Sequence, residues 1–233
     1  MERNHKIIGM DIGGSHATAG LFDPALQEGE PVSLAGRDID SGKQAATIIG
    51  NISSTILELV KGDEPVKHIG IAFPGPFDYK NGISAICNVG GKFESTFGLH
   101  VRQALMDATG LAQTQFRFKN DAHCFAIGAW HKYGLAGKNV VFLTLGTGFG
   151  SAFYSNDQLL EQHPGIPESG AYFDQPYGES IADDYFSTRW ILKEYQKLTG
   201  RKDITVRAMA ADPDSPATYV FNLFGKNLGT FLQ

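Results

Sequence analysis

The sequence predicts an α/β protein with two related lobes. Apolar stretches of strand length alternate along the chain with stretches whose apolar residues recur at helical spacing, and this alternation is typical of the α/β class. A strand, a glycine turn and a return strand occur at residues 7–22 and again at residues 140–154. A similar hairpin at the start of each half favours two similar lobes.

The expected elements follow from local patterns. Strands are predicted where short apolar runs are bounded by glycine, proline or polar turn residues: residues 5–11, 15–22, 33–39, 68–73, 115–119, 140–145 and 151–154. Helices are predicted where apolar residues recur every three or four positions: residues 43–61, 99–108, a stretch that starts just after Asp121, a stretch from near Ser180 through Ile191, and residues 218–232.

Composition and charge exclude several classes of protein. With 233 residues, 42% hydrophobic and 19% charged, the chain has the profile of an ordinary globular protein. A formal net charge of −5 argues against broad binding to nucleic acid or to a membrane surface. Two cysteines, Cys87 and Cys124, allow one disulfide at most and form no metal-binding motif. Neither a signal peptide nor a long apolar span is recognisable, so a cytoplasmic location is expected.

Two glycine turns are candidate phosphate-binding loops, because glycine lets backbone N–H groups converge on a phosphate. The first contains Asp11, Gly13, Gly14 and Ser15, and the second contains Gly146, Thr147, Gly148 and Gly150. Neither has the lysine of a Walker loop, and a strand rather than a helix is expected after the second. A purely structural hairpin turn remains the alternative for each.

Three carboxylates are further candidates for functional residues. Asp121 follows Asn120 at a strand-to-helix junction, where it could accept a proton from a hydroxyl group. Helix capping is the alternative for this pair, and the two roles are compatible. Glu168 lies in a loop and Glu179 lies near an expected helix start, so residue type and position alone assign no function to either.

The order of four motifs is more specific than any one of them. Asp11-Ile12-Gly13-Gly14-Ser15, Ala72-Phe73-Pro74-Gly75-Pro76-Phe77-Asp78, Asn120-Asp121-Ala122 and Leu145-Gly146-Thr147-Gly148-Phe149-Gly150 follow one another along the chain. Together they resemble the ROK family, which groups bacterial sugar kinases with sugar-responsive repressors. The resemblance covers about residues 7–190.

The resemblance implies a ribonuclease H-like, actin-like ATPase fold: two α/β lobes with a cleft between them. We place the N-terminal lobe at residues 1–118 and the C-terminal lobe at residues 119–233. ROK proteins continue for some tens of residues beyond the position of Gln233, so we expect the second lobe to be incomplete at its C-terminus. Resemblance also favours a homodimer.

The resemblance also implies roles for individual residues. Asp121 matches the catalytic base, and Asp11 is expected to hold Mg²⁺ through water. The phosphates of ATP are expected at Asp11, Gly13, Gly14, Ser15, Gly146, Thr147, Gly148 and Gly150. The sugar substrate is expected at Gly75, Asn88, Asn120, Asp121, Glu168 and Glu179.

One departure from the family pattern concerns zinc. ROK proteins usually carry a GExGH segment followed by a cysteine cluster that binds zinc. Here Ala171 occupies the position of the zinc-binding histidine, and no cysteine occurs in the region. We therefore expect no structural zinc site and an altered sugar preference.

The expected activity is transfer of the ATP γ-phosphoryl group to a primary hydroxyl of a hexose, with glucose O6 as the leading acceptor. The alternatives are a non-catalytic sugar-binding sensor or inactive remnant, a kinase for N-acetylmannosamine, fructose or allose, and a kinase that uses polyphosphate as donor. Only ten residues precede Asp11, too few for a DNA-binding domain, so a DNA-binding repressor is not expected.

Overall fold

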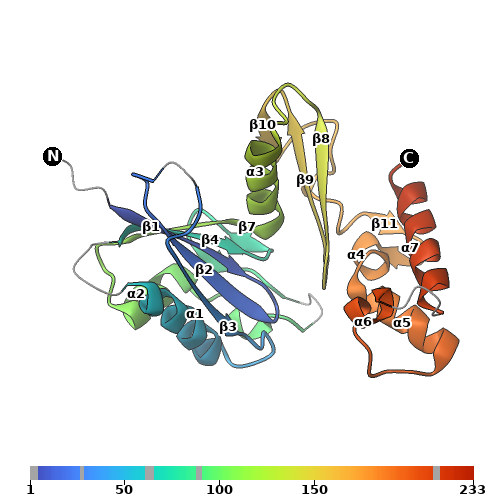
Figure 1. Ribbon diagram of the computed structural model, residues 1–233, viewed down its shortest axis with the longest axis horizontal. Coiled ribbons are helices and arrows are strands. Elements are labelled where there is room, and N and C mark those ends of the chain that lie inside the picture. The colour runs from blue at the N-terminus through green and yellow to red at the C-terminus, as the bar shows by residue number, and fades with distance from the viewer. Residues whose placement is uncertain (1–4, 27–28, 61–65, 88–90, 212–215) are drawn as a thin grey trace. The chain divides into compact units, whose positions relative to one another are not determined.

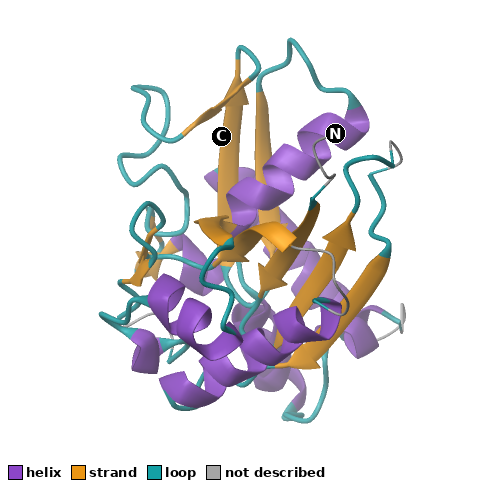
Figure 2. Cartoon of the chain, turned by 90° about the vertical axis from the view of Figure 1, so that its left-hand side faces the viewer, coloured by secondary structure: helices purple, strands orange, loops and turns teal. Residues whose placement is uncertain are grey.

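The computed structural model describes residues 5–26, 29–60, 66–87, 91–211 and 216–233. The chain forms two compact units, Met1–Cys124 and Phe125–Gln233. Helix α3 (Asp121–Tyr133) begins in the first unit and continues into the second. Figure 1 labels the elements along the chain, and Figure 2 colours them by type. The two units are described separately.

The first unit is built on a mixed five-stranded sheet with strand order β3-β2-β1-β4-β7. Its strands are β1 (Lys6–Ile12), β2 (His16–Phe22), β3 (Ser33–Asp38), β4 (Val66–Phe73) and β7 (Gln115–Asn120). Strands β1, β2 and β3 pair antiparallel, whereas β1, β4 and β7 run parallel. Shorter elements complete the unit: β5 (Phe77–Asp78), β6 (Ile83–Ser84) and a 3₁₀ turn at Glu94–Thr96.

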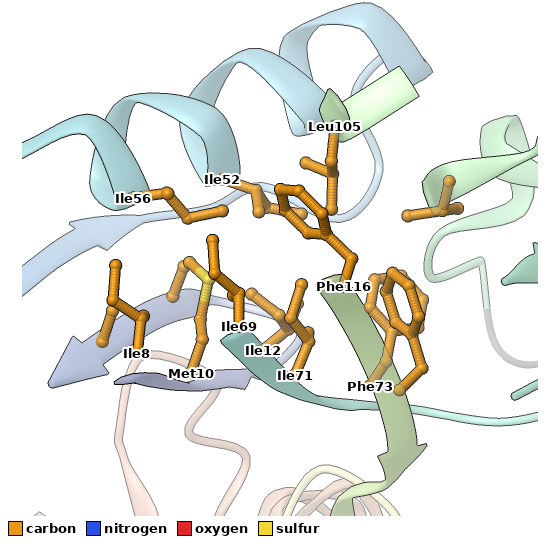
Figure 3. Packing of buried hydrophobic residues seen from close by; sticks show 14 of the residues in the cluster. Ile8, Met10, Ile12, Ile52, Ile56, Ile69, Ile71, Phe73, Leu105 and Phe116 are labelled. Atoms are coloured by element: carbon orange, nitrogen blue, oxygen red, sulfur yellow. The ribbon is translucent and has the colours of Figure 1, made fainter. Parts of the chain in front are cut away.

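Helices α1 (Ala45–Leu59) and α2 (Val101–Thr109) cover one face of this sheet (Figure 1). Strand β1 alternates buried and less buried side chains, as expected when one face of a strand meets the core. Figure 3 shows Ile8 and Met10 of β1 facing Ile52 and Ile56 of α1. Ile8, Ile52 and Ile56 are completely buried, so helix and sheet share one hydrophobic core.

Parallel pairing brings three strand ends to one edge of the sheet. Asp11 of β1 lies opposite Ala72 of β4, and Ala72 lies opposite Lys119 of β7. The residues that follow these positions leave the sheet on the same edge. In open α/β sheets, ligands bind at the carboxyl ends of parallel strands, so this edge is the first place to look for a functional site.

The second unit contains a three-stranded antiparallel sheet and a group of helices. Strands β8 (Val140–Leu145), β9 (Phe149–Ser155) and β10 (Gln158–Leu160) form the sheet in the order β10-β9-β8. Trp130 of α3 stacks on Tyr154 of β9 with ring centroids 4.5 Å apart, which fixes the helix on the sheet. A short hairpin, β11 (Pro176–Tyr177) and β12 (Ser180–Ile181), precedes α4 (Ala182–Tyr185), α5 (Thr188–Thr199), α6 (Val206–Ala210) and α7 (Ala217–Phe231).

The predicted strands are all present, with ends shifted by at most two residues. The single helix predicted from near Ser180 through Ile191 is wrong, because β12, α4 and α5 occupy that stretch. Ser187 has extended backbone angles that interrupt the helix, and the neighbouring Phe186 side chain is fully buried in the core of the second unit. No helix in the described part of the chain is long and apolar enough to span a membrane.

Candidate functional site

The first glycine turn connects β1 to β2, and two of its carbonyl groups accept hydrogen bonds from a later segment of the chain. The backbone N–H groups of Ile39 and Ser41 donate to the carbonyls of Ser15 and Gly14, at 3.0 and 3.2 Å. The N–H groups of Gly14 and Ser15 have no hydrogen-bond partner among the described residues. Adjacent unpaired backbone amides of this kind form an anion-binding surface.

Asp11 lies near the end of β1, beside this turn, with an exposed side chain. Its carboxylate is 3.5 Å from Nε2 of His16, whose ring occupies the space next to Gly13. A Cβ atom on Gly13 would lie 2.5 Å from Cε1 of that ring. Mg²⁺ in phosphoryl-transfer sites is usually held by one or two carboxylates together with water and substrate phosphates, and an exposed Asp11 fits that requirement. The described residues hold no cluster of three or more side chains suited to binding a metal by themselves.

Asn120 and Asp121 occupy the junction between β7 and α3. The side-chain oxygen of Asn120 accepts the N–H of His123 at 3.2 Å, which is the bond expected of a helix N-cap. Asp121 accepts the N–H of Ala122 at 2.9 Å. Asn120 therefore caps the helix, and Asp121 is the first helical residue, at the point where strand becomes helix.

The environment raises the pKa of the Asp121 carboxyl above its ordinary value. Desolvation is the largest cause, and the negative charge of Asp11 acts in the same direction; the N–H of Ala122 and the charge of Lys92 oppose them. Asp121 is nevertheless exposed to solvent in the structure, so a ligand can reach it. One turn along α3, desolvation raises the pKa of the Cys124 thiol to about 11, which keeps that group protonated.

Gly75 follows β4 at the same edge of the sheet, close to the side chains of Tyr79 and Asn120. The Tyr79 hydroxyl donates to the carbonyl of Phe73 at 3.1 Å and accepts the Asn120 amide at 3.2 Å. A Cβ atom on Gly75 would lie 3.1 Å from that hydroxyl. Asn88, the remaining sugar-binding residue predicted for this unit, lies outside the described residues.

The second glycine turn joins β8 to β9. The N–H of Gly146 donates to the carbonyl of Gly148 at 3.0 Å, whereas the N–H groups of Thr147 and Gly148 have no partner in the described chain. The second turn, like the first, therefore has two adjacent unpaired amides. Gly150, which was predicted to belong to the turn, lies in β9 and pairs with Thr144, because the return strand begins two residues earlier than predicted.

Two charged residues that the sequence did not single out support the second turn. The carboxylate of Asp183 accepts the N–H of Phe149 at 2.6 Å and pairs with Arg189. The first N–H of α5, from Thr188, donates to the carbonyl of Gly146 at 2.8 Å. The break between α4 and α5 therefore places polar groups of both helices against the turn, a relationship that local sequence patterns do not encode.

Glu168 and Glu179 lie on exposed segments of the second unit. Glu168 lines a pocket together with Gln162, His163, Pro164, Ile166 and Pro167. Glu179 lies in the turn of the β11–β12 hairpin, where its N–H donates to the Tyr185 hydroxyl at 3.2 Å. The assignment of both glutamates to sugar binding stays a prediction.

The sheet order of the first unit, whose parallel strands bring Asp11 and Asp121 to one edge, is that of the ribonuclease H-like, actin-like fold. The chain belongs to the ROK family, whose sequence pattern it matches over residues 7–172.

Comparison with individual proteins agrees with this assignment. The chain is 32% identical over 207 residues to a glucokinase of Thermotoga maritima, covering 82% of this chain and 62% of the relative. It therefore spans less than two thirds of that relative's length. A ROK family glucokinase of Streptomyces griseus, solved with glucose and AMPPNP, has a TM-score of 0.71 at 21% identity, with 93% of this chain and 74% of that one covered. A ROK family transcriptional regulator, a homologue of the E. coli MLC protein, has a TM-score of 0.72 at 18% identity, with 97% and 61% covered.

Proposed function

We propose that this chain belongs to an ATP-dependent sugar kinase that phosphorylates a primary hydroxyl of a hexose. The observation that carries the proposal is the position of Asp121: a carboxylate with a raised pKa at the carboxyl edge of three parallel strands. The unpaired amides of Gly14 and Ser15 belong to the turn that follows the first of these strands. A base and a phosphate-binding turn are two of the parts found in enzymes that transfer a phosphoryl group to an alcohol.

Asp121 is the proposed general base. Phosphoryl transfer needs the acceptor hydroxyl to lose its proton as the new P–O bond forms, and a carboxylate can accept that proton. Desolvation and the charge of Asp11 both raise the pKa of Asp121, so the carboxylate holds a proton more strongly than an ordinary aspartate does. It is the first residue of α3, next to the Asn120 cap, and its carboxylate accepts the Ala122 N–H at 2.9 Å.

The proposed phosphate contacts are backbone amides. Gly14 and Ser15 offer N–H groups in the first turn, and Thr147 and Gly148 offer them in the second. Such donors stabilise the charge on the phosphoryl oxygens without moving. Mg²⁺, when bound, would neutralise phosphate charge, and Asp11 is the residue that would hold it.

The proposed sugar contacts are Asn120, Gly75, Asn88, Glu168 and Glu179, in addition to Asp121. Glucose O6 is the leading acceptor, and the resemblance to a glucokinase supports this choice. N-acetylmannosamine and fructose remain the alternative sugars, and polyphosphate remains an alternative donor.

A sugar-binding sensor without catalysis is the second candidate. The fold of this chain is as similar to a ROK transcriptional regulator as to a ROK glucokinase, so fold similarity does not separate the two activities. Asp121 favours the kinase, because a sensor has no need of a carboxylate base with a raised pKa at this position.

A coupled ADP-release assay tests the proposal. The protein is supplied with Mg·ATP or polyphosphate and with glucose, fructose, N-acetylglucosamine or N-acetylmannosamine, and a reaction without sugar measures background hydrolysis. We expect ADP release that depends on glucose. Folded protein that releases no ADP but gains thermal stability from one of the sugars would instead be a sensor.

A further inference from the structure

Three groups link the end of β4 to the start of α3. The Tyr79 hydroxyl lies between the Phe73 carbonyl, at 3.1 Å, and the Asn120 side-chain amide nitrogen, at 3.2 Å. Phe73 is the last residue of β4 and Asn120 is the last residue of β7. The two residues are paired in the register of these strands, so Tyr79 bridges neighbouring strand ends at the candidate site.

The donor and acceptor roles in this bridge can be assigned without ambiguity. The Phe73 carbonyl has no proton, so it must accept from the Tyr79 hydroxyl. The single hydroxyl proton is then used, and Tyr79 must accept from Asn120. The other end of the Asn120 amide faces the N–H of His123, which only an oxygen can accept. Both contacts therefore place the Asn120 nitrogen toward Tyr79.

This assignment limits what Asn120 can do for a ligand. Its oxygen accepts from the α3 backbone, and one of its two amide protons points to Tyr79. The second amide proton has no acceptor among the described residues. Through this proton Asn120 is available to a ligand as a hydrogen-bond donor, and the group that the proton meets must be an acceptor, such as a hydroxyl oxygen.

The surroundings keep the bridge in place. The Tyr79 ring packs on Phe77 with centroids 5.2 Å apart, and Phe77 is itself buried. Gly75 lies beside the hydroxyl, and a Cβ atom there would approach it to 3.1 Å, tighter than ordinary contact. A glycine at this position leaves the hydroxyl room between its two partners.

We propose that Tyr79 is a positioning residue that orients Asn120 as a donor to an acceptor oxygen of the sugar substrate. The proposal rests on the proposed function, because it assigns a role in the same sugar site. A sugar hydroxyl whose oxygen accepts from Asn120 still has its own proton to donate. The carboxylate of the adjacent Asp121 can accept that proton in a hydrogen bond.

The Tyr79→Phe variant removes the bridging hydroxyl and keeps the ring. We expect the KM for the sugar to rise about fivefold to tenfold, the loss typical of one hydrogen bond, with kcat and the KM for ATP changed by less than about twofold. Tyr219→Phe is the matched control, because Tyr219 is an exposed tyrosine of α7, and it should leave every parameter unchanged. Asn120→Asp keeps a capping oxygen but removes the amide donor, so we expect a larger loss of sugar affinity than with Tyr79→Phe.

A second measurement does not depend on activity. The Asn120 side-chain amide resonances, assigned by their absence in Asn120→Asp, should shift in Tyr79→Phe without sugar present and stay in place in Tyr219→Phe. Unshifted amide resonances would overturn the bridge. Shifted resonances with an unchanged sugar KM would overturn the positioning role.

The test also separates this inference from the proposed function. If the wild-type chain releases no ADP with any sugar, the kinase proposal fails on its own. Calorimetric titration of the same sugars into the wild-type chain and into Tyr79→Phe then decides the inference. Weaker binding by the variant supports it, and equal binding or no binding to either protein overturns it.

Discussion

The carboxylate of Asp183 accepts the backbone N–H of Phe149 at 2.6 Å, directly after the second glycine turn. The same carboxylate pairs with Arg189 in the first turn of α5. A Cβ atom on Gly148 would lie 3.0 Å from Asp183, so the carboxylate packs closely against the turn. Asp183 thus connects a proposed phosphate-binding turn to α4, on which Asp183 lies, and to α5, on which Arg189 lies.

Replacing Asp183 should weaken nucleotide binding. In Asp183→Ala the Phe149 N–H loses its acceptor and Arg189 loses its partner, so we expect the KM for ATP to rise about tenfold, which corresponds to roughly 1.4 kcal/mol. Asp184→Ala is the control, because Asp184 accepts the Ser180 hydroxyl instead. Steady-state kinetics with ATP varied measures both, and equal KM values for the two variants would contradict the supporting role of Asp183.

The first glycine turn should tolerate an added methyl group at one glycine but not at its neighbour. In Gly13→Ala the new Cβ would lie 2.5 Å from the His16 ring, whereas in Gly14→Ala the nearest atom is Cδ of Lys92 at 3.4 Å. We expect Gly13→Ala to lower the free energy of unfolding by about 1–3 kcal/mol and Gly14→Ala to lower it less. Urea denaturation measures these changes. Adding His16→Ala should restore part of the stability lost in Gly13→Ala, and no recovery would contradict a clash with His16.

The core of the first unit should depend strongly on α1. Ile56 is fully buried and its neighbour Leu57 is 42% exposed. We expect Ile56→Ala to lower the free energy of unfolding by about 2–5 kcal/mol, because it removes buried methyl groups and leaves a cavity. Leu57→Ala, a matched loss of a large aliphatic side chain on the same helix, should cost much less. Urea denaturation of the two variants should separate them clearly, and similar losses would contradict the packing of α1 on the sheet.

The raised pKa of Asp121 predicts how activity depends on pH. A general base must be ionised, so kcat/KM should fall as the pH drops through the pKa of Asp121, and the midpoint should lie above the ordinary value of 3.8. A pH profile of sugar-dependent ADP release measures the midpoint. A midpoint at or below the ordinary value would contradict the desolvation of this carboxylate.

The same pKa shift has a consequence for stability. A carboxyl group with a higher pKa in the folded state than in the unfolded state costs stability when it is ionised. That cost is present at neutral pH and disappears as the pH falls through the folded-state pKa. Asp121→Asn should therefore unfold at the same temperature as the wild type or a higher one at neutral pH, and this advantage should vanish in acid. Thermal unfolding of both proteins across the pH range measures the difference, and a clearly lower unfolding temperature of the variant at neutral pH would contradict it.

Much of the fold follows from patterns that lie within single segments. The alternation of apolar residues in β1 and the helical spacing of Ile48, Ile52 and Ile56 predict the elements and also the faces that meet in the core. The break at Ser187 could not be predicted in this way, because the apolar residues on both sides of it continue at helical spacing. Phe186, directly before the break, is fully buried in the core of the second unit, and such tertiary packing is not encoded in the local pattern.

The candidate site also contains some residues that the sequence predicts and others that it does not. Asn120 and Asp121 are recognisable because they fall at a strand-to-helix junction, and the structure assigns the capping bond to Asn120. Tyr79 and Asp183 gave no signal in the sequence, because each acts through a partner that is distant along the chain. Such residues become visible only when the fold brings the partners together.

Replacing the proposed base tests the central claim most directly. Asp121→Asn keeps the size of the side chain and an oxygen for the Ala122 N–H, but it cannot take a proton from a hydroxyl. The account predicts that sugar-dependent ADP release falls by about 10²- to 10⁴-fold, while calorimetric titration shows a sugar Kd within about threefold of the wild type. A variant that releases ADP at a near-normal rate would remove Asp121 as the base and contradict the account.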